Sequence, residues 1–180
     1  MRRFGLSTLP DRTWEVAALG LGGNIGDPPT AMAEALRQID RSDDCRLVSV
    51  SKLYSTPPWG KLDQADFFNC CALVETVLEP EALLQLCLSI ERNMKRVRVE
   101  RWGPRTIDID VLTYGNREQK TQTLELPHPR MTERGFVIKP LADIAPEMVL
   151  NGRTVDAWLQ EVDVTGIRVA ENDPDWWRSA

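Results

Sequence analysis

The order of hydrophobic and polar positions along this chain predicts four strands and two helices. Short apolar or alternating runs predict the strands, at 15–21, 46–54, 67–77 and 106–114. Apolar residues that recur every three or four positions predict the helices, at 28–40 and 80–94. The resulting order, β-α-β-β-α-β, is typical of an α+β, ferredoxin-like sandwich in which helices pack on an antiparallel sheet.

Local signals support the first helix and leave the C-terminal third less regular. Asp27 suits an N-cap and Pro28 suits the first helical position. After Gly115 the chain is irregular, and we expect only short helices near 141–144 and 155–161. Gly20 to Gly26 does not match a dinucleotide-binding fingerprint, so we interpret it as a tight strand-to-helix turn.

Length and composition predict one domain with a substantial core. The chain has 180 residues, of which 42% are hydrophobic and 27% charged, as in soluble globular proteins. We expect a flexible extension over 1–14, a domain over 15–165 and a C-terminal tail over 166–180. From Glu171 to Ala180 the chain is polar apart from Trp176-Trp177, which either dock on the domain or belong to a disordered end. No apolar run is long enough to span a membrane.

Charge and cysteine content exclude other classes of protein. A net charge of -5 and a pI near 5.0 argue against a general nucleic-acid binder. Positive charge is local, and between residues 92 and 105 it comes from Arg92, Lys95, Arg96, Arg98, Arg101 and Arg105. The four cysteines lack zinc-site spacing, so we interpret them as small buried side chains. Cys70 and Cys71 should face opposite sides of one strand.

The strongest chemical signal is a pair of aspartates in the last predicted strand. Asp108 and Asp110 are two positions apart, so they project from one face, while Ile107, Ile109 and Val111 project from the other. Two neighbouring carboxylates repel each other unless a cation lies between them. Mg²⁺ prefers oxygen ligands and completes its shell with water and substrate phosphates. The pair therefore predicts a magnesium–nucleotide site.

The basic segment directly before these aspartates fits the same interpretation. A run of charge is usually a solvated face, but Arg96, Arg98, Arg101 and Arg105 surround Trp102-Gly103-Pro104 between a helix and the two carboxylates. Arginine makes bidentate contacts to phosphate, and a loop that closes excludes water from phosphoryl transfer. We interpret the segment as a lid over a triphosphate.

Three further positions are candidates for ligand binding. His128 is the only histidine and lies between two prolines, which suits either a structural role or a contact to phosphate. Phe67 and Asn69 share a strand face and offer a stacking surface and an amide that matches the edge of a heterocycle such as a pterin. Phe136 could supply a second stacking face. The aromatic residues alone would equally suit a core.

These residues lie in motifs that resemble one family, the 6-hydroxymethyl-7,8-dihydropterin pyrophosphokinases of folate biosynthesis. The matching segments, in the family's order, are Leu21-Gly22-Gly23-Asn24, Tyr54-Ser55-Thr56-Pro57-Pro58, Asp66-Phe67-Phe68-Asn69, Arg101 to Asp110, Leu126-Pro127-His128-Pro129 and Arg134-Gly135-Phe136. The resemblance covers about residues 15 to 150. It implies a ferredoxin-like enzyme that transfers the β,γ-pyrophosphoryl group of ATP to the pterin hydroxymethyl group and releases AMP.

The resemblance also implies roles for individual residues. Asp108 and Asp110 would hold two Mg²⁺ ions, and Arg96 and Arg105 would neutralise charge on the transferred group. The implied ATP-binding residues are Glu91, Arg96, Arg98, Arg101, Trp102, Arg105, Val111, His128 and Arg134. The implied pterin-binding residues are Thr56, Pro57, Pro58, Trp59, Phe67, Asn69, Asp108 and Phe136. The chain departs from the family pattern at Gly23, Phe67 and Pro129, none of which is a metal ligand or a phosphate-binding arginine.

Other functions fit parts of the pattern. A ferredoxin-like module that binds a nucleotide or nucleic acid without catalysis would need exposed aromatic residues on central strands and a basic sheet face. The strand over 67–77 has aromatic residues only at its start, and the basic residues lie in one loop. A kinase that transfers only the γ-phosphoryl group would share the Mg–ATP residues, and an inactive relative would have lost some of them. We expect a cytoplasmic, monomeric enzyme whose partners are its two substrates, with no nucleic acid and no membrane.

Overall fold

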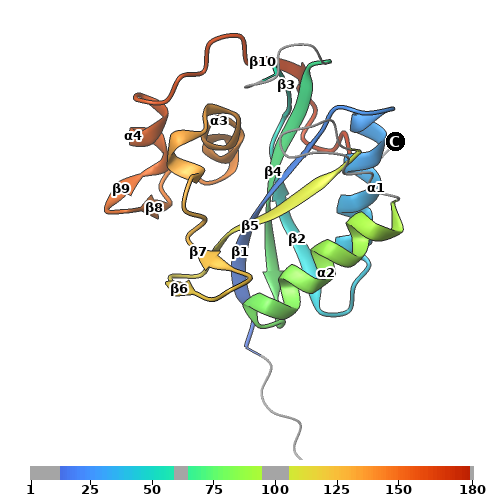
Figure 1. The fold of residues 1–180 in the computed structure, drawn as a ribbon, viewed down its shortest axis with the longest axis vertical. Helices are drawn as coiled ribbons and strands as arrows, with labels where there is room; N and C mark the ends of the chain where they lie inside the picture. The colour runs from blue at the N-terminus through green and yellow to red at the C-terminus, as the bar shows by residue number, and fades with distance from the viewer. Residues whose placement is uncertain (1–12, 59–64, 95–105, 179–180) are drawn as a thin grey trace, which may run out of the picture.

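A computed structural model describes residues 13–58, 65–94 and 106–178, and it is built around a central antiparallel sheet. The strands of this sheet are β1 (Glu15–Gly23), β2 (Cys45–Val50), β3 (Leu53–Thr56), β4 (Phe67–Thr76), β5 (Asp108–Tyr114) and β10 (Arg168–Glu171). Their order is β10-β3-β4-β1-β5, and β2 pairs with β4 on the same side as β3. Leaving β10 aside, this is the predicted ferredoxin-like topology, and Figure 1 shows helices packed against the sheet.

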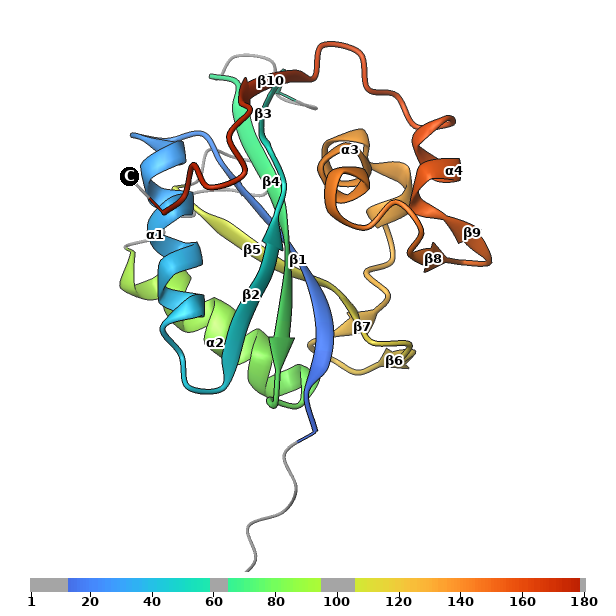
Figure 2. The ribbon, with the colours of Figure 1, turned by 180° about the vertical axis from the view of Figure 1, so that it is seen from behind.

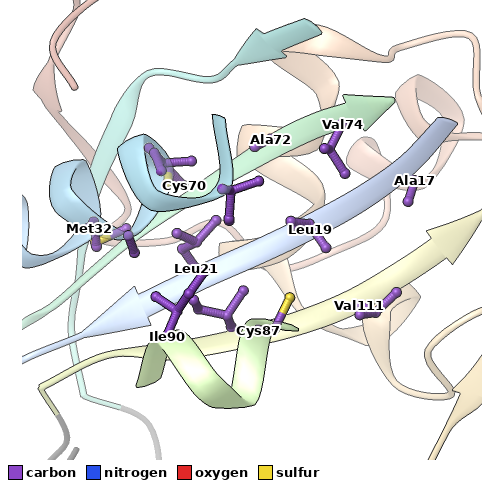
Figure 3. Close-up of a cluster of buried hydrophobic side chains, with 14 of the residues drawn as sticks. Ala17, Leu19, Leu21, Met32, Cys70, Ala72, Val74, Cys87, Ile90 and Val111 are labelled. Carbon is purple, nitrogen blue, oxygen red and sulfur yellow. The ribbon is translucent and has the colours of Figure 1, made fainter. Parts of the chain in front are cut away.

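Two long helices cover one face of the sheet (Figure 1). They are α1 (Pro28–Asp40) and α2 (Pro80–Asn93). As predicted, Asp27 caps α1, because its side chain accepts a hydrogen bond from the backbone N–H of Thr30 at 3.2 Å. The apolar sides of both helices meet the sheet in one buried cluster that includes Leu19, Met32, Cys87 and Val111 (Figure 3).

The opposite face of the sheet is covered by the C-terminal third of the chain. There α3 (Gly135–Ile144) packs on β4 and β3, and α4 (Val155–Leu159) packs on α3. Between β5 and α3 lie β6 (Gln119–Lys120), β7 (Glu125–Leu126) and a 3-10 turn η1 (Met131–Glu133). Between α3 and α4 lie β8 (Val149–Leu150) and β9 (Arg153–Thr154). A second buried cluster lies under α3 and includes Cys71, Leu112 and Ile138. The adjacent Cys70 and Cys71 thus face opposite sides of the sheet, as predicted.

The prediction for residues 46–54 was wrong in one respect. It predicted one continuous strand, whereas the structure has two, β2 and β3, with Ser51 and Lys52 between them. A register shift between Leu47 and Ser49 inserts an extra residue opposite β4, so the alternation changes sides at Val48. Leu47 and Val50 therefore both face the helix-side cluster, although they are three residues apart.

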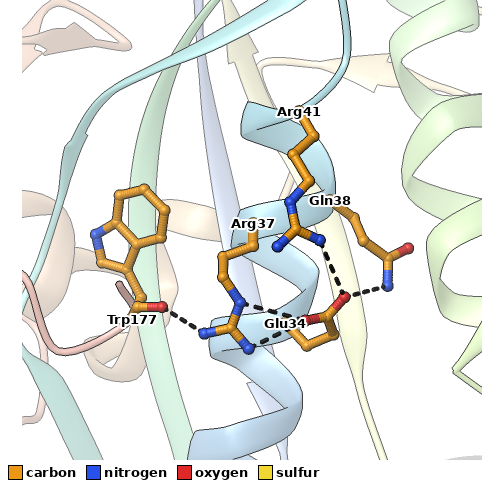
Figure 4. A network of polar contacts seen from close by, with 5 residues as sticks. All are labelled: Glu34, Arg37, Gln38, Arg41 and Trp177. Carbon is orange, nitrogen blue, oxygen red and sulfur yellow. Dashed lines mark hydrogen bonds and ion pairs between the residues drawn. The ribbon is translucent and has the colours of Figure 1, made fainter. Parts of the chain in front are cut away.

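The end of the described chain docks on the domain. Of the two alternatives left open for Trp176 and Trp177, the structure therefore shows docking. Strand β10 pairs with β3, and the chain then crosses to the α1 side of the sheet (Figure 2). Trp177 is 3% exposed, and its carbonyl accepts a hydrogen bond from Arg37 at 2.8 Å (Figure 4). Trp176 donates its indole N–H to the carbonyl of Ser51 at 3.1 Å.

Among the described residues, no helix has the length and apolarity needed to cross a membrane. The longest helix there, α2, has 14 residues and carries polar side chains on its outer side.

Candidate active site

A pocket of about 430 Å³ opens where β1, β4 and β5 meet the start of α3. Its size is within the usual range for small-molecule sites. It is lined by residues from six parts of the chain: Gly20 and Gly22 of β1, Thr56 and Pro57 of β3 and its loop, Phe67 and Asn69 of β4, Leu84, Leu88 and Glu91 of α2, Asp108 and Asp110 of β5, and His128, Arg130, Arg134 and Phe136. A ligand there would touch both layers of the fold.

The two aspartates enter this pocket together, as the alternation of β5 predicts. Asp108 and Asp110 line the pocket and are half-buried, whereas Ile109 between them is 2% exposed and faces the helix-side core. Opposite them in β1 stand Gly22 and Gly20, which add no side chain to the space. Among the described residues no group of three or more His, Cys, Asp or Glu side chains could hold a metal. A carboxylate pair suits Mg²⁺, which takes further ligands from substrate phosphates.

Glu91 of α2 holds the backbone of β5 in place through a hydrogen bond. It is 2% exposed, and its Oε1 accepts a hydrogen bond at 2.7 Å from the backbone N–H of Ile109, the residue between the two aspartates. Because β5 is an edge strand of the sheet, this amide has no neighbouring strand on its outer side. Glu91 therefore fixes the backbone from which both carboxylates project.

Cationic and imidazole groups, His128, Arg130 and Arg134, form another part of the pocket lining, here called the cationic rim. His128 lies close to both Asp110 and Arg134, and Arg130 and Arg134 line the same space. Burial lowers the pKa of His128, Asp110 raises it, and Arg134 lowers it further. Nδ1 of His128 accepts a hydrogen bond at 3.2 Å from the backbone N–H of Arg130, so the neutral ring carries its proton on Nε2. This leaves Nε2 as a hydrogen-bond donor, which suits an anionic ligand.

An aromatic and amide region forms the other end of the pocket. Phe67, Asn69 and Phe136 all line it, the first two from β4 and the third from α3. Asn69 is 6% exposed and donates from Nδ2 to Oγ1 of Thr56, which in turn donates to the carbonyl of Phe67 at 3.1 Å. The orientation of the Asn69 amide is thus set by the protein, with its second N–H and its oxygen available for a heterocycle.

The structure brings most of the predicted site residues together. The predicted residues that line the pocket are Thr56, Pro57, Phe67, Asn69, Glu91, Asp108, Asp110, His128, Arg134 and Phe136. Two do not line it: Pro58 lies beyond the rim, and Val111 is 2% exposed in the helix-side core. The remaining ones, Trp59, Arg96, Arg98, Arg101, Trp102 and Arg105, lie outside the described residues.

Sequence reasoning assigned no role in the site to several residues that line it, among them Gly20, Gly22 and Arg130. Both glycines lie inside β1 and line the pocket, whereas we interpreted Gly20 to Gly26 as a tight turn, although Gly20 also falls in the predicted strand over 15–21. A Cβ on Gly22 would come within 2.9 Å of Oδ1 of Asn69. Glycine inside a strand often marks such a close approach, and this signal could have identified them. Arg130, two residues after His128, was also missed.

The fold and the pocket define a class of protein, a ferredoxin-like α+β domain with paired carboxylates and an aromatic, amide-lined pocket at one edge of its sheet. Residues 18–146 match the family described as 7,8-dihydro-6-hydroxymethylpterin-pyrophosphokinase, HPPK. The chain belongs to this family, which confirms the resemblance found in its motifs.

Individual relatives support the assignment. A protein of Methylorubrum extorquens named 2-amino-4-hydroxy-6-hydroxymethyldihydropteridine pyrophosphokinase is 46% identical over 155 residues, which are 86% of this chain and 98% of the relative. A protein of the same name from Bacillus subtilis is 39% identical over 154 residues, 86% of this chain and 89% of the relative. The HPPK-DHPS protein of Plasmodium falciparum has a similar fold, with a TM-score of 0.67 and 16% identity; the match covers 86% of this chain and 43% of that longer one.

Proposed function

We propose that this protein transfers the pyrophosphoryl group of ATP to the hydroxymethyl group of 6-hydroxymethyl-7,8-dihydropterin and releases AMP. The observation that carries the proposal is that one pocket joins a carboxylate pair to an aromatic and amide region. A triphosphate needs the first and a flat heterocycle with a polar edge needs the second. We expect the enzyme to act as a cytoplasmic monomer in folate biosynthesis.

In this proposal the pterin lies between Phe67 and Phe136. Stacking on two aromatic faces holds a planar ring without directional bonds, and the amide of Asn69 supplies a donor and an acceptor for its edge. The hydroxymethyl group then points across β1 toward Asp108 and Asp110, because Gly22 pairs with Asn69 on one side and with Asp108 on the other. Holding both reactants in one geometry converts a bimolecular reaction into an effectively unimolecular one.

The triphosphate lies between the carboxylates and the cationic rim. Asp108 and Asp110 would hold magnesium, and we propose two ions. Bound magnesium supplies charge neutralisation on the phosphates and acidifies a nearby hydroxyl. Arg130, Arg134 and Nε2 of His128 contact phosphate oxygens from the opposite side. Arg96, Arg98, Arg101, Trp102 and Arg105 belong to the same proposal on the basis of the sequence alone.

The reaction is a displacement at the β-phosphorus of ATP. The hydroxyl oxygen of the pterin forms a new bond to this phosphorus, the bond between the β-phosphorus and the oxygen bridging it to the α-phosphorus breaks, and AMP leaves with that oxygen. The hydroxyl proton is lost in the same process. The groups that hold the two substrates contribute mainly position and charge, as is usual for phosphoryl transfer.

The test is an incubation with ATP, MgCl₂ and 6-hydroxymethyl-7,8-dihydropterin, followed by chromatography of the nucleotides. We expect AMP and pterin pyrophosphate in equal amounts, and neither product when the pterin or the magnesium is omitted. Formation of ADP would instead identify a kinase that transfers the γ-phosphoryl group. Absence of turnover, with ATP still bound, would contradict the proposed acceptor.

A further inference from the structure

The segment of residues 163–171, here called the C-terminal strap, lies beyond the matched family region and contacts two segments that carry residues of the pocket. It leaves α4 on the α3 side of the sheet and reaches the edge strand β3, where it becomes β10 (Figures 1 and 2). On this path it contacts the segments that carry both aromatic walls of the pocket.

The strap holds the wall formed by Thr56, Pro57 and Phe67. In the β10–β3 ladder Arg168 pairs with Ser55, directly before Thr56. Arg168 also forms an ion pair at 3.3 Å with Asp66, the residue before Phe67, and Ser55 donates to the same carboxylate oxygen at 3.1 Å. Both side chains of this ion pair are exposed to solvent, so the pair contributes little. The backbone hydrogen bonds between β10 and β3 therefore provide most of the attachment of the strap to β3.

A close contact at Gly166 adds to this attachment. Gly166 has φ +77°, a conformation that L-residues rarely adopt, and a Cβ built on it would lie 2.8 Å from Cγ of Pro57. The strap thus passes Pro57 without room for one methyl group. A side chain at residue 166 would therefore have to displace either Pro57 or the strap.

The same segment also contacts the wall formed by Arg134 and Phe136. Between these two residues lies Gly135, the first residue of α3, and a Cβ there would lie 2.0 Å from the carbonyl oxygen of Asp163. The side chain of Ile167 would be 3.4 Å from the same Cβ. The backbone of the strap therefore lies directly against the turn that places Phe136.

We propose that the C-terminal strap positions the two walls of the pterin pocket relative to each other, with Gly166 and Gly135 as positioning residues at its two contacts. The proposal rests on the pterin pocket of the proposed function. It assigns a role to a part of the chain outside the matched family region, and it predicts that damage to the strap weakens pterin binding more than ATP binding.

The test compares Gly166→Ala with Gly152→Ala. Gly152 has nearly the same backbone conformation, φ +78°, but nothing lies within 4 Å of its Cβ position. Both variants carry the same backbone strain, and only the first also displaces Pro57. We expect Gly166→Ala to raise the KM for pterin by about fivefold or more while the KM for ATP changes by less than about twofold. Gly152→Ala should leave both constants within about twofold of the wild type.

Hydrogen exchange measured by mass spectrometry gives a readout that does not require activity. We expect Gly166→Ala to raise the exchange of peptides over both 53–57 and 135–139, and Gly152→Ala to leave both unchanged. Equal KM values in the two variants, or no coupled change in exchange, would overturn the proposal. If wild-type protein made no AMP but the coupled exchange were observed, the strap would still position the pocket walls, and only the pterin assignment would fail.

Discussion

At the scale of single residues, the two aspartates depend on a hydrogen bond made by the residue between them. Alternation along β5 predicts that Asp108 and Asp110 share a face, and the structure agrees. It does not predict that Glu91, 17 residues before Asp108 in the chain, would accept the N–H of Ile109. A buried carboxylate with a backbone partner has no local sequence signal, because both groups come together only in the folded sheet.

Replacing Asp110 by Ala tests the carboxylate pair. We expect turnover to fall by about 10³-fold or more, because a group that organises charge around the transferred phosphate is lost. The fold should be retained, since Asp110 is only half-buried. Formation of AMP and unfolding in urea are the two measurements. Asp43→Ala, which removes an exposed carboxylate from a loop, is the control, and similar activity in the two variants would contradict the assignment.

Replacing Glu91 by Ala and by Gln separates hydrogen bonding from charge. Ala leaves the N–H of Ile109 without its acceptor, and we expect a loss of about 1–3 kcal/mol in unfolding free energy. Gln retains a carbonyl oxygen at this position, so most of that stability should remain. Urea unfolding followed by circular dichroism measures the difference. Equal destabilisation by both substitutions would mean that charge, rather than the hydrogen bond, is what β5 requires.

At the scale of elements, the strands and helices with strong periodicity were predicted closely, and those with conflicting signals were not. α1 agrees residue by residue with the predicted range 28–40. α3 was predicted only near 141–144, although it begins at Gly135. Gly135 and Pro140 both disfavour a helix, and burial against β4 overrides them here. Gly135 is there because the carbonyl of Asp163 leaves no space for a side chain.

The contact between α3 and β3 leads to a prediction for Tyr54. Its hydroxyl donates to both carboxylate oxygens of Asp143, at 2.9 and 3.0 Å, and burial, followed by this carboxylate, raises the pKa of Tyr54. We expect Tyr54→Phe to lower the unfolding free energy by about 1–3 kcal/mol, because a charged group loses a buried partner. Urea unfolding measures this loss, and the KM for pterin should rise because α3 and β3 carry its two walls.

A matched control for this variant is Tyr114→Phe. The hydroxyl of Tyr114 donates to the carbonyl of Leu78 at 2.7 Å, so it also loses a buried hydrogen bond, but it joins no pocket wall. We expect lower stability and an unchanged KM for pterin. If both variants changed this KM equally, the effect would come from general loss of stability.

At the scale of the whole molecule, the predicted boundary of a tail at residue 166 separates segments that pack together. Residues 171–180 are polar apart from the two tryptophans, and a four-residue exposed strand such as β10 is too short to give a clear hydrophobic pattern. Within the described part of the tail, Trp177 is buried in the helix-side core and Trp176 packs against it. Docking of this kind depends on a surface assembled from distant segments, and a pattern along the chain does not contain it.

The contribution of this docking can be measured with Trp177→Ala. Removing a buried indole should lower the unfolding free energy by about 3–5 kcal/mol, the usual cost for a large aromatic residue in a core. Trp176→Ala is the control, because Trp176 is only partly buried and should cost less. A change below about 1 kcal/mol in the urea unfolding of Trp177→Ala would mean that the tail contributes little to the domain.

The back-to-back placement of Cys70 and Cys71 gives the protein a natural probe of how its two layers open. Cys70 lies in the helix-side cluster and Cys71 in the cluster under α3, and burial raises the pKa of both thiols. Neither thiol reacts until the layer that covers it separates from the sheet. Because the two residues are neighbours in one strand, any difference between their labelling rates reports which layer leaves first.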